Sequence, residues 1–241
     1  MLNKRCGKGS GVIQRVLLWV VVLGWVNGAA AEEVNPDPWE GFNRKMFAFN
    51  EAVDEYLWLP ATKGYRYITP EPVQRGVHNF VGNLNDVVSL FSNILQLKFH
   101  NSMQDLARVV VNTTFGLGGL FDVATPAGVA KQHEEFGQVL GYWGVPSGPY
   151  LVLPFLGPSN IRDGFSWLPN AYLHPVTFYD DESFNWSYTL LYALDLRSEL
   201  MKSEALISGD RYTFIRDAYM QRREYLVNDG QIDDIYGDDG F

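Results

Sequence analysis

The chain has 241 residues, of which 46% are hydrophobic and 15% aromatic, and its formal net charge is −9. An acidic chain of this kind is a poor candidate for binding nucleic acid, or for binding anionic lipid headgroups through charge alone. The single cysteine, Cys6, lies near the N-terminus. The remainder of the chain can therefore form no disulfide and use no catalytic thiol.

Residues 1–31 have the features of a secretory signal peptide. Basic residues precede an apolar run over residues 16–26. Residues 29–31 are alanines that suit a cleavage site. As a helix the run would rise only about 16 Å, so a permanent membrane span is not expected. No cysteine follows the run directly, as it would in a bacterial lipoprotein. We expect export, a helical domain over residues 32–230 and an acidic, mobile tail over residues 231–241.

Residues 37–59 predict an amphipathic helix. Asp37 suits its N-cap, Pro38 its first position and Pro60 its end. Apolar residues recur every three or four positions along it, at Trp39, Phe42, Met46, Phe49, Val53 and Tyr56. This pattern favours a helix that packs on an apolar core.

Further helices are expected over residues 72–84, 87–97 and 102–111, with residues 65–69 as a connector. Asn85 or Asp86 could cap the second of these helices. Residues 87–97 are apolar around most of the helix, so that helix is either fully buried or lies in a membrane interface, and the sequence slightly favours burial.

Residues 112–163 combine many glycines with aromatic and aliphatic residues, which predicts a turn-rich apolar insertion sheltered by helices. Residues 167–186 have no clean period and read as loop with short helical pieces. Two closing helices are expected over residues 188–206 and 211–227, with Gly230 as a stop. Leu190, Leu191, Leu194 and Leu200 are expected to face inward. The predicted fold is all-α.

The sequence shows no catalytic, cofactor-binding or metal-binding pattern. His133 is followed by two glutamates but by no histidine four positions later, so no zinc-protease motif forms. A metal site built from distant residues stays open. Ser147 lies one place too late for a nucleophile elbow. A hydrolase acting on lipids would need Ser147 or His133.

Several motifs resemble the MlaA (VacJ) family, in the same order and over nearly the whole of residues 37–230. They are DPWEGFNR from residue 37, NTTFGLGGLFDVA from residue 112, FGQVLGYWGV from residue 136, GPYLVLPF from residue 148 and RDAYMQRR from residue 216. The resemblance implies a ring-like arrangement of helices in the inner leaflet of the outer membrane of a Gram-negative bacterium. Interfacial helices would include residues 73–84 and 87–97.

The resemblance also implies a function and partners. Family members lie beside a trimeric outer-membrane porin and take mislocalised phospholipid from the outer leaflet through an amphipathic channel. They pass it to a soluble periplasmic carrier (MlaC-like), which maintains lipid asymmetry. No cofactor and no bond-making step are implied. The alternative is a soluble periplasmic scaffold whose apolar helices are simply its core.

The resemblance assigns roles to three groups of residues. The channel hairpin is expected to include Phe115, Gly116, Leu117, Gly118, Gly119, Leu120, Phe121 and Asp122. Hinges or close helix contacts are expected at Gly141, Gly144 and Gly148, and the channel entrance near Phe49 and Asn50. The charged residues Asp122, Arg162 and Asp163 are expected on a wet channel wall or at the periplasmic rim.

Overall fold

The structure is a computed structural model that describes residues 35–231. The predicted signal peptide, Cys6 and almost all of the predicted tail lie outside the described residues. The described residues from Pro36 onward belong to one compact unit.

Helices make up most of this unit and the only sheet in its described part has two strands, so the prediction of an all-α fold is confirmed. The elements, in chain order, are α2 (Glu40–Val53), the π-helical turn η1 (Asp54–Trp58), α3 (Leu59–Ile68), α4 (Glu71–Leu95), α5 (Phe99–Phe115), α6 (Phe136–Tyr142), β1 (Tyr150–Leu153), β2 (Gly157–Asn160), α7 (Ile161–Leu173), the 3-10 turn η2 (Pro175–Phe178), α8 (Glu182–Ser203), the 3-10 turn η3 (Glu204–Leu206) and α9 (Arg211–Val227).

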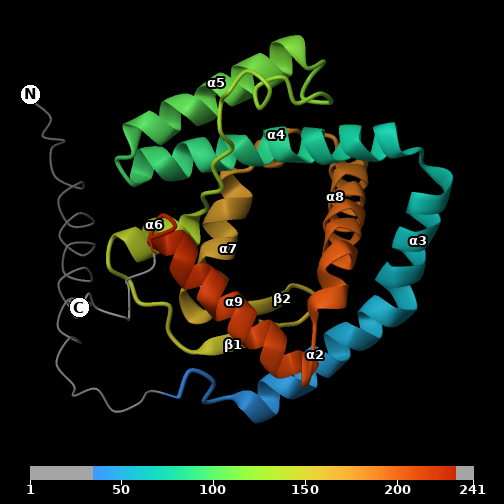
Figure 1. Ribbon diagram of the computed structural model, residues 1–241, viewed down its shortest axis with the longest axis vertical. Coiled ribbons are helices and arrows are strands. Elements are labelled where there is room, and N and C mark those ends of the chain that lie inside the picture. The colour runs from blue at the N-terminus through green and yellow to red at the C-terminus, as the bar shows by residue number, and fades with distance from the viewer. Residues whose placement is uncertain (1–34, 232–241) are drawn as a thin grey trace, which may run out of the picture. The chain divides into compact units, whose positions relative to one another are not determined.

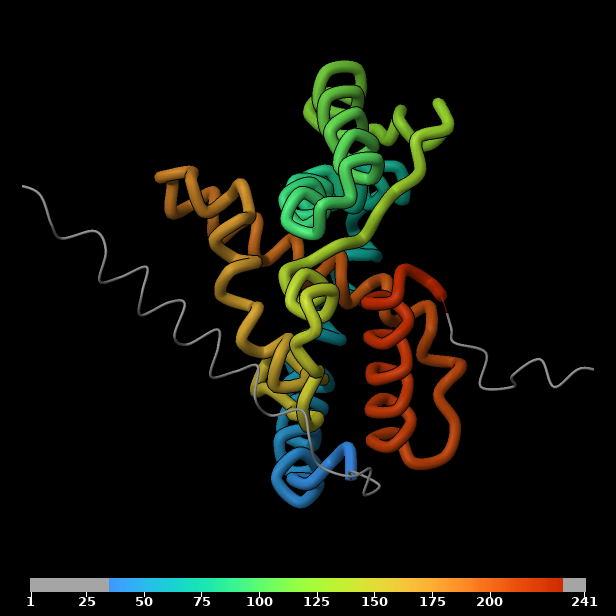
Figure 2. The backbone as a smooth tube through the Cα atoms, turned by 90° about the vertical axis from the view of Figure 1, so that its left-hand side faces the viewer, coloured from blue at the N-terminus to red at the C-terminus, as the bar shows by residue number. Residues whose placement is uncertain are grey.

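The helices of this unit follow one another around its edge. In Figure 1, α2, α3 and α4 succeed each other along this edge, and α5 doubles back over α4. Helices α7 and α8 both contact α4. Figure 2 shows α9 on one side of α6 and the segment from α7 to η2 on the other. No helix in the described range 35–231 combines the length and the apolarity needed to cross a membrane.

The first helical segment runs further than predicted. Helices α2 and α3 are joined through η1 without a break, so Pro60 is an early residue of α3 and not the end of the helix. A proline is tolerated near the start of an α-helical segment because its missing N–H is not needed there. The predicted connector at residues 65–69 is mostly the last turn of α3. Asp37, predicted as an N-cap, is instead buried and accepts hydrogen bonds from Asn43 and Tyr212.

The two predicted helices 72–84 and 87–97 are one helix, α4, of 25 residues. Asn85 and Asp86, expected at a cap, lie in its middle. Asp86 is fully buried there and forms an ion pair with Arg108 of α5. Because a partner on the neighbouring helix satisfies the carboxylate, it does not need a helix end.

Polar side chains of α2 hold the small sheet in place. Strands β1 and β2 are antiparallel, with Tyr150 opposite Asn160 and Leu153 opposite Gly157. Asn43 donates to the carbonyl of Tyr150 at 3.0 Å and accepts from the N–H of Val152 at 2.9 Å. These bonds complete the hydrogen bonding of the outer edge of β1.

The C-terminal half is more helical than the sequence suggests. The region 167–186, predicted mainly as loop, contains the second half of α7 with Pro169 inside it, η2 and the start of α8. The predicted last helix, residues 211–227, coincides with α9 and is capped by Asp210. Gly230 has φ of 80° and donates its N–H to the carbonyl of Tyr225, as expected for a helix stop.

The interior of this unit is largely polar. Nine apolar residues of the described range are buried, against twenty-two polar or charged ones. Three of the nine buried apolar residues, Tyr150, Val152 and Tyr212, form a small cluster, against which Met46, Phe47, Tyr219 and Met220 pack. Water-soluble domains show the opposite distribution, because burying polar groups costs free energy unless each is paired.

Candidate functional site

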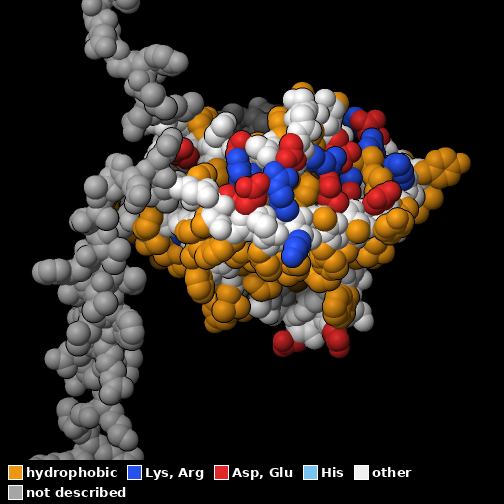
Figure 3. Space-filling view, turned by 90° about the horizontal axis from the view of Figure 1, so that it is seen from below, with side chains coloured by type: hydrophobic (Ala, Val, Ile, Leu, Met, Phe, Trp, Pro, Cys, Tyr) orange, Lys and Arg blue, Asp and Glu red, His pale blue; other side chains and the backbone are white. Residues whose placement is uncertain are grey.

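Large hydrophobic side chains lie exposed on every long helix, and α9 carries only one of them. On α5, Phe99 is 66% and Met103 is 63% exposed, and Phe115 at its end is 71% exposed. The one exposed large hydrophobic side chain of α9 is Tyr225, at 48%. Figure 3 shows an area of mixed Lys, Arg, Asp and Glu side chains with a band of hydrophobic side chains along its border. We call this hydrophobic band the apolar belt. Exposed apolar surface on this scale marks contact with lipid or with another protein.

Several side chains predicted to face a core face outward instead. Phe42 and Tyr56 of the first apolar stripe are exposed, as are Leu190 and Leu200 of α8, whereas Leu194 is buried as expected. The period of an amphipathic helix fixes which residues share a face, but not whether that face meets a core or lipid. The expectation that the apolar helices are simply core is therefore wrong. The alternative of a soluble periplasmic scaffold rested on that expectation and is not supported.

Helices α4 and α5 pack together through their polar faces. Arg108 of α5 is almost fully buried, with its Nε 3.0 Å from Oδ2 of Asp86 and Nη2 3.2 Å from Oδ2 of Asp122. Its Nη1 donates to the hydroxyl of Thr125 and to the carbonyl of Val129, both at 2.9 Å. One guanidinium therefore joins α4, α5 and the loop that follows α5.

The two carboxylates around Arg108 differ in their environment. Burial raises the pKa of Asp86, and the nearby Lys131 and Arg108 only partly offset it. Burial also acts to raise the pKa of Asp122, but hydrogen bonds from Thr125 and Arg108 outweigh it and hold the pKa well below its usual range. Asp122 is therefore a firmly ionised anchor at the start of the loop.

The predicted hairpin, residues 115–122, is a compact turn at the end of α5. The N–H groups of Gly118 and Gly119 donate to the carbonyls of Thr113 and Asn112, each at 2.9 Å. Leu117, Gly118 and Gly119 all have positive φ, of 52°, 73° and 95°. Glycine takes this left-handed conformation without strain. The described residues 116–135 contain no strand, so the segment is a turn followed by a loop, not a β-hairpin.

We call the packed polar faces of α4 and α5, around Arg108 and Asp86, the polar seam. Asparagine side chains hold the turn against this seam. Asn112 accepts hydrogen bonds from the N–H groups of Val123 and Ala124, at 2.8 Å and 2.9 Å. From α4, Asn79 donates to the carbonyl of Leu120 at 3.1 Å, and Asn83 donates to the hydroxyl of Thr113 at 3.0 Å. The backbone of the turn is thereby held, while its apolar side chains, such as Leu117, are exposed.

The apolar side of the turn borders a small cavity. This apolar cavity, of about 330 Å³, is lined by the turn, α4 and α8, including Leu117, Leu120, Phe80 and Leu191. A second, polar cavity of about 720 Å³ lies between the end of α3, the start of α4 and α8. Leu191 and Asp195, one helical turn apart on α8, line the apolar and the polar cavity respectively. Two neighbouring turns of the same helix therefore offer an apolar and a polar environment.

The three glycines predicted as hinges or close contacts differ from each other. A Cβ on Gly141 would lie 2.8 Å from Val227 of α9 and from Arg162 of α7, so this glycine permits a close helix contact. Gly144 and Gly148 have positive φ and lie in the loop before β1. The hinge role stays a prediction.

The predicted channel entrance lies where α2 meets the sheet. Asn50 donates to the carbonyl of Leu153 at 2.9 Å and accepts from the N–H of Phe155 at 2.7 Å. Phe49 packs edge to face on Phe155, with ring centroids 5.2 Å apart. These contacts hold the turn between β1 and β2. Asn43 and Asn50 lie two helical turns apart, so both contact this part of the sheet from one face of α2.

The side chains of Arg162 and Asp163 are 5% and 7% exposed and form an ion pair with an Nε–Oδ1 distance of 3.0 Å. Arg223 of α9 is the second cation beside Asp163. Burial acts to raise the pKa of Asp163, but the two arginines and Tyr219 outweigh it, so the pKa is lowered. The pairs join α7 to α9. Asp122 and Asp163 are thus both held in ion pairs with arginines, and their place on a channel wall or at the periplasmic rim stays a prediction.

The sequence of α4 contains a stripe of polar residues, which a count of apolar residues does not reveal. Small polar residues recur every three or four positions along the helix: Asn79, Asn83, Asp86, Ser89, Asn93 and Gln96. From Asn83 onward these residues are buried. In a soluble helix such a stripe would face water. Its lack of long charged side chains is the feature that fits burial against a second polar helix.

Comparison with known proteins identifies the family. The sequence profile of the family described as MlaA lipoprotein matches residues 35–226, almost the whole described range. This chain belongs to the MlaA lipoprotein family. The predicted resemblance is confirmed.

Individual proteins also resemble the chain over most of its length. The intermembrane phospholipid transport system lipoprotein MlaA of Shigella flexneri is 33% identical over 218 residues, covering 88% of this chain and 86% of that protein. A Rickettsia bellii protein is 36% identical over 195 residues, covering 79% and 76%. A solved structure from work on the maintenance of bacterial outer membrane lipid asymmetry matches with a TM-score of 0.70 and 33% identity, covering 80% of this chain and 99% of that one.

Proposed function

We propose that this chain transports phospholipid from the outer leaflet of the outer membrane towards the periplasm and so maintains lipid asymmetry. The observation that carries the proposal is a distribution of side chains opposite to that of a water-soluble domain. The interior is polar, and the exposed surface carries the apolar belt. A protein of this kind is stable in a lipid environment without a spanning helix, since its apolar faces replace lipid contacts. The Shigella relative's name, intermembrane phospholipid transport system lipoprotein, supports the same function.

The two cavities suggest how a lipid would be accommodated. A phospholipid has a charged headgroup and apolar acyl chains, and the polar and apolar cavities on neighbouring turns of α8 match these two parts. The turn at residues 115–122 borders the apolar cavity, where a change in its shape would alter access. In this proposal no covalent bond is made or broken. The chain acts as a passage, not as an enzyme.

Location and partners follow from the same surface. We propose that the apolar belt lies in the periplasmic leaflet of the outer membrane and that α9, with its charged surface, faces the periplasm. A trimeric porin would contact part of the apolar belt, and a soluble MlaC-like carrier would receive lipid on the α9 side. Exposed large hydrophobic side chains are frequent on α5, α7 and α8 and sparse on α9, and this distribution supports the orientation.

The test measures phospholipid on the surface of intact cells, as the amount cleaved by added phospholipase. Deleting the gene should raise this amount and restoring it should lower it. Leu120→Ser places a hydroxyl in the apolar cavity and should restore only part of the function. Leu206→Ser changes an exposed leucine of η3 that lines neither cavity, and should restore it fully. Unchanged surface phospholipid on deletion would refute the proposed function.

A further inference from the structure

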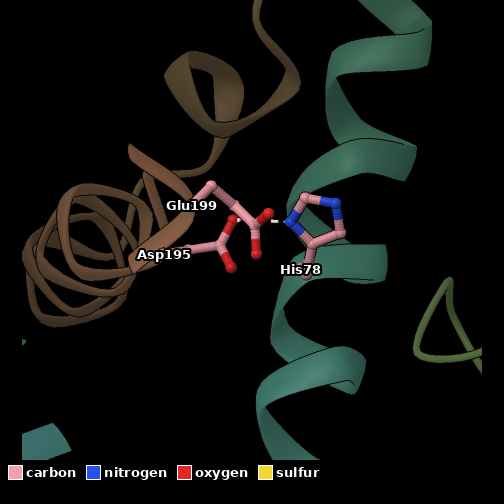
Figure 4. A group of neighbouring side chains, drawn as sticks. All are labelled: His78, Asp195 and Glu199. Atoms are coloured by element: carbon pink, nitrogen blue, oxygen red, sulfur yellow. Dashed lines mark hydrogen bonds and ion pairs between the residues drawn. The ribbon is translucent and has the colours of Figure 1, made fainter. Parts of the chain in front are cut away.

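Three potential metal ligands from two helices meet at the wall of the polar cavity. His78 of α4 faces Asp195 and Glu199, which lie one turn apart on α8 (Figure 4). One ligand atom from each side chain lies within 4.8 Å of the other two, and Nδ1 of His78 is 3.0 Å from Oδ2 of Asp195. His78 is more than a hundred residues from the two carboxylates in the sequence. For this reason no local sequence motif predicts the cluster.

The cluster is accessible from the polar cavity, which all three side chains line. Asp195 is almost completely buried, whereas the side chain of His78 is half exposed. The hydroxyl of Tyr65, which lines the same cavity, is buried without a hydrogen-bond partner among the described residues. Burial, and after it the charge of Asp195, raises the pKa of Tyr65, so the carboxylate is within electrostatic reach of this hydroxyl. An unpartnered polar atom in the same cavity as the cluster suits a bound cation or its water.

One positive group already touches the cluster. Nζ of Lys202 lies 2.6 Å from Oε1 of Glu199, which leaves the second carboxylate oxygen for another partner. A hydrogen-bonded proton lies between Nδ1 of His78 and Oδ2 of Asp195, which are 3.0 Å apart. A metal ion would replace that proton and compete with Lys202 for Glu199.

The geometry is close to that of a three-ligand zinc site. Ligand atoms at about 2.0–2.2 Å from a tetrahedral zinc ion lie about 3.3–3.6 Å apart. The His78–Asp195 pair, at 3.0 Å, is slightly closer than this, and the other two pairs lie within 4.8 Å, so small side-chain shifts would give the zinc geometry. One imidazole and two carboxylates are a ligand set for zinc, and the fourth position would open into the polar cavity.

We propose that His78, Asp195 and Glu199 bind a divalent cation of the zinc type, which links α4 to α8 at the wall of the polar cavity. The site holds the two helices in a fixed relation and leaves one coordination position for an oxygen ligand from the cavity. This proposal is independent of lipid transport, since a cation can bind whether or not lipid passes.

The experiment titrates Zn²⁺ into the full chain, purified in detergent with a tag free of histidine and stripped of metal. Isothermal titration calorimetry gives stoichiometry and affinity, and Co²⁺ as a substitute reports the ligand sphere by its visible absorption. We expect one site per chain. His78→Ala and Glu199→Gln should each weaken binding by at least the roughly 10–100-fold that loss of an outer-sphere partner costs. Lys202→Met should strengthen it, because a competing cation is removed.

His100→Ala is the matched control, because His100 is an exposed histidine on α5 whose neighbour is Gln104 and not a carboxylate. This variant should bind Zn²⁺ like the unaltered chain. Circular dichroism checks that each variant is folded. Absence of binding, or equal binding by the folded His78→Ala variant, would overturn the proposal and leave the cluster as an ion-pair network. Loss of Zn²⁺ binding with normal lipid asymmetry would separate this site from the proposed function.

Discussion

Replacing Arg108 by methionine tests whether the polar seam between α4 and α5 holds the fold together. The guanidinium is the shared partner of Asp86 and Asp122, and its side chain is 2% exposed. Methionine keeps much of the volume but leaves both carboxylates without this cation. Removing one partner from a buried ion pair costs about 3–5 kcal/mol, because an uncompensated charge stays buried.

The assay is the thermal unfolding midpoint in detergent, followed by circular dichroism. For a domain of this size 1 kcal/mol corresponds to about 2–4 °C, so Arg108→Met should lower the midpoint by about 6–20 °C. Arg75→Met is the control, because Arg75 pairs with Glu71 on the surface of α4 where both are about 70% exposed. Exposed pairs of this kind contribute about 0–1 kcal/mol.

A second arm separates charge from packing. Adding Asp86→Asn and Asp122→Asn to Arg108→Met removes the unpaired charges and should recover part of the lost stability. If Arg108→Met shifted the midpoint no more than Arg75→Met does, the polar seam would not be a source of stability. The account of an interior held by buried ion pairs would then be refuted.

Three further predictions follow from single residues. Burial raises the pKa of Asp105 to about 7, so its ionisation destabilises the fold: this contribution is absent below pH 4, grows as the pH rises from about 4 to 7 and is constant above that. Asp105→Asn should therefore raise the thermal midpoint at pH 8 relative to the unaltered chain and flatten its decline between pH 4 and 7, whereas the exposed Glu55→Gln should do neither. Gly141→Ala should destabilise the fold by about 1–3 kcal/mol, because its Cβ meets α9 and α7, while Gly64→Ala, with open space around it, should stabilise it by about 0.5–1 kcal/mol in denaturant unfolding. Gly118→Pro should abolish transport by disrupting the turn, since φ is 73° and the N–H donates a hydrogen bond; full activity in the surface phospholipid assay would contradict the role of the turn.

The sequence alone determined the all-α class, the last helix and the family. Helical periods and a stop at Gly230 predict α9 within a residue, because periodicity and helix stops are local properties of the chain. The motifs of the glycine-rich segment are specific enough to indicate the family without any knowledge of how the chain folds. The predicted helix boundaries were wrong at Pro60, which follows a π-helical turn, and at Asp86, which lies in the middle of α4. In both places the structural context overrides the local rule for helix ends.

Only the tertiary structure decided which way each helix faces. A stripe of apolar residues has the same period whether it meets a core or lipid, so Phe42 and Leu200 are predicted inward and lie outward. The partners of Arg108 and the meeting of His78 with Asp195 join residues that are distant in sequence, and no spacing rule encodes such contacts. The physical reason is that burial depends on what packs against a face. In this chain buried ion pairs and asparagine side chains fill the interior, so the apolar side chains are left on the surface.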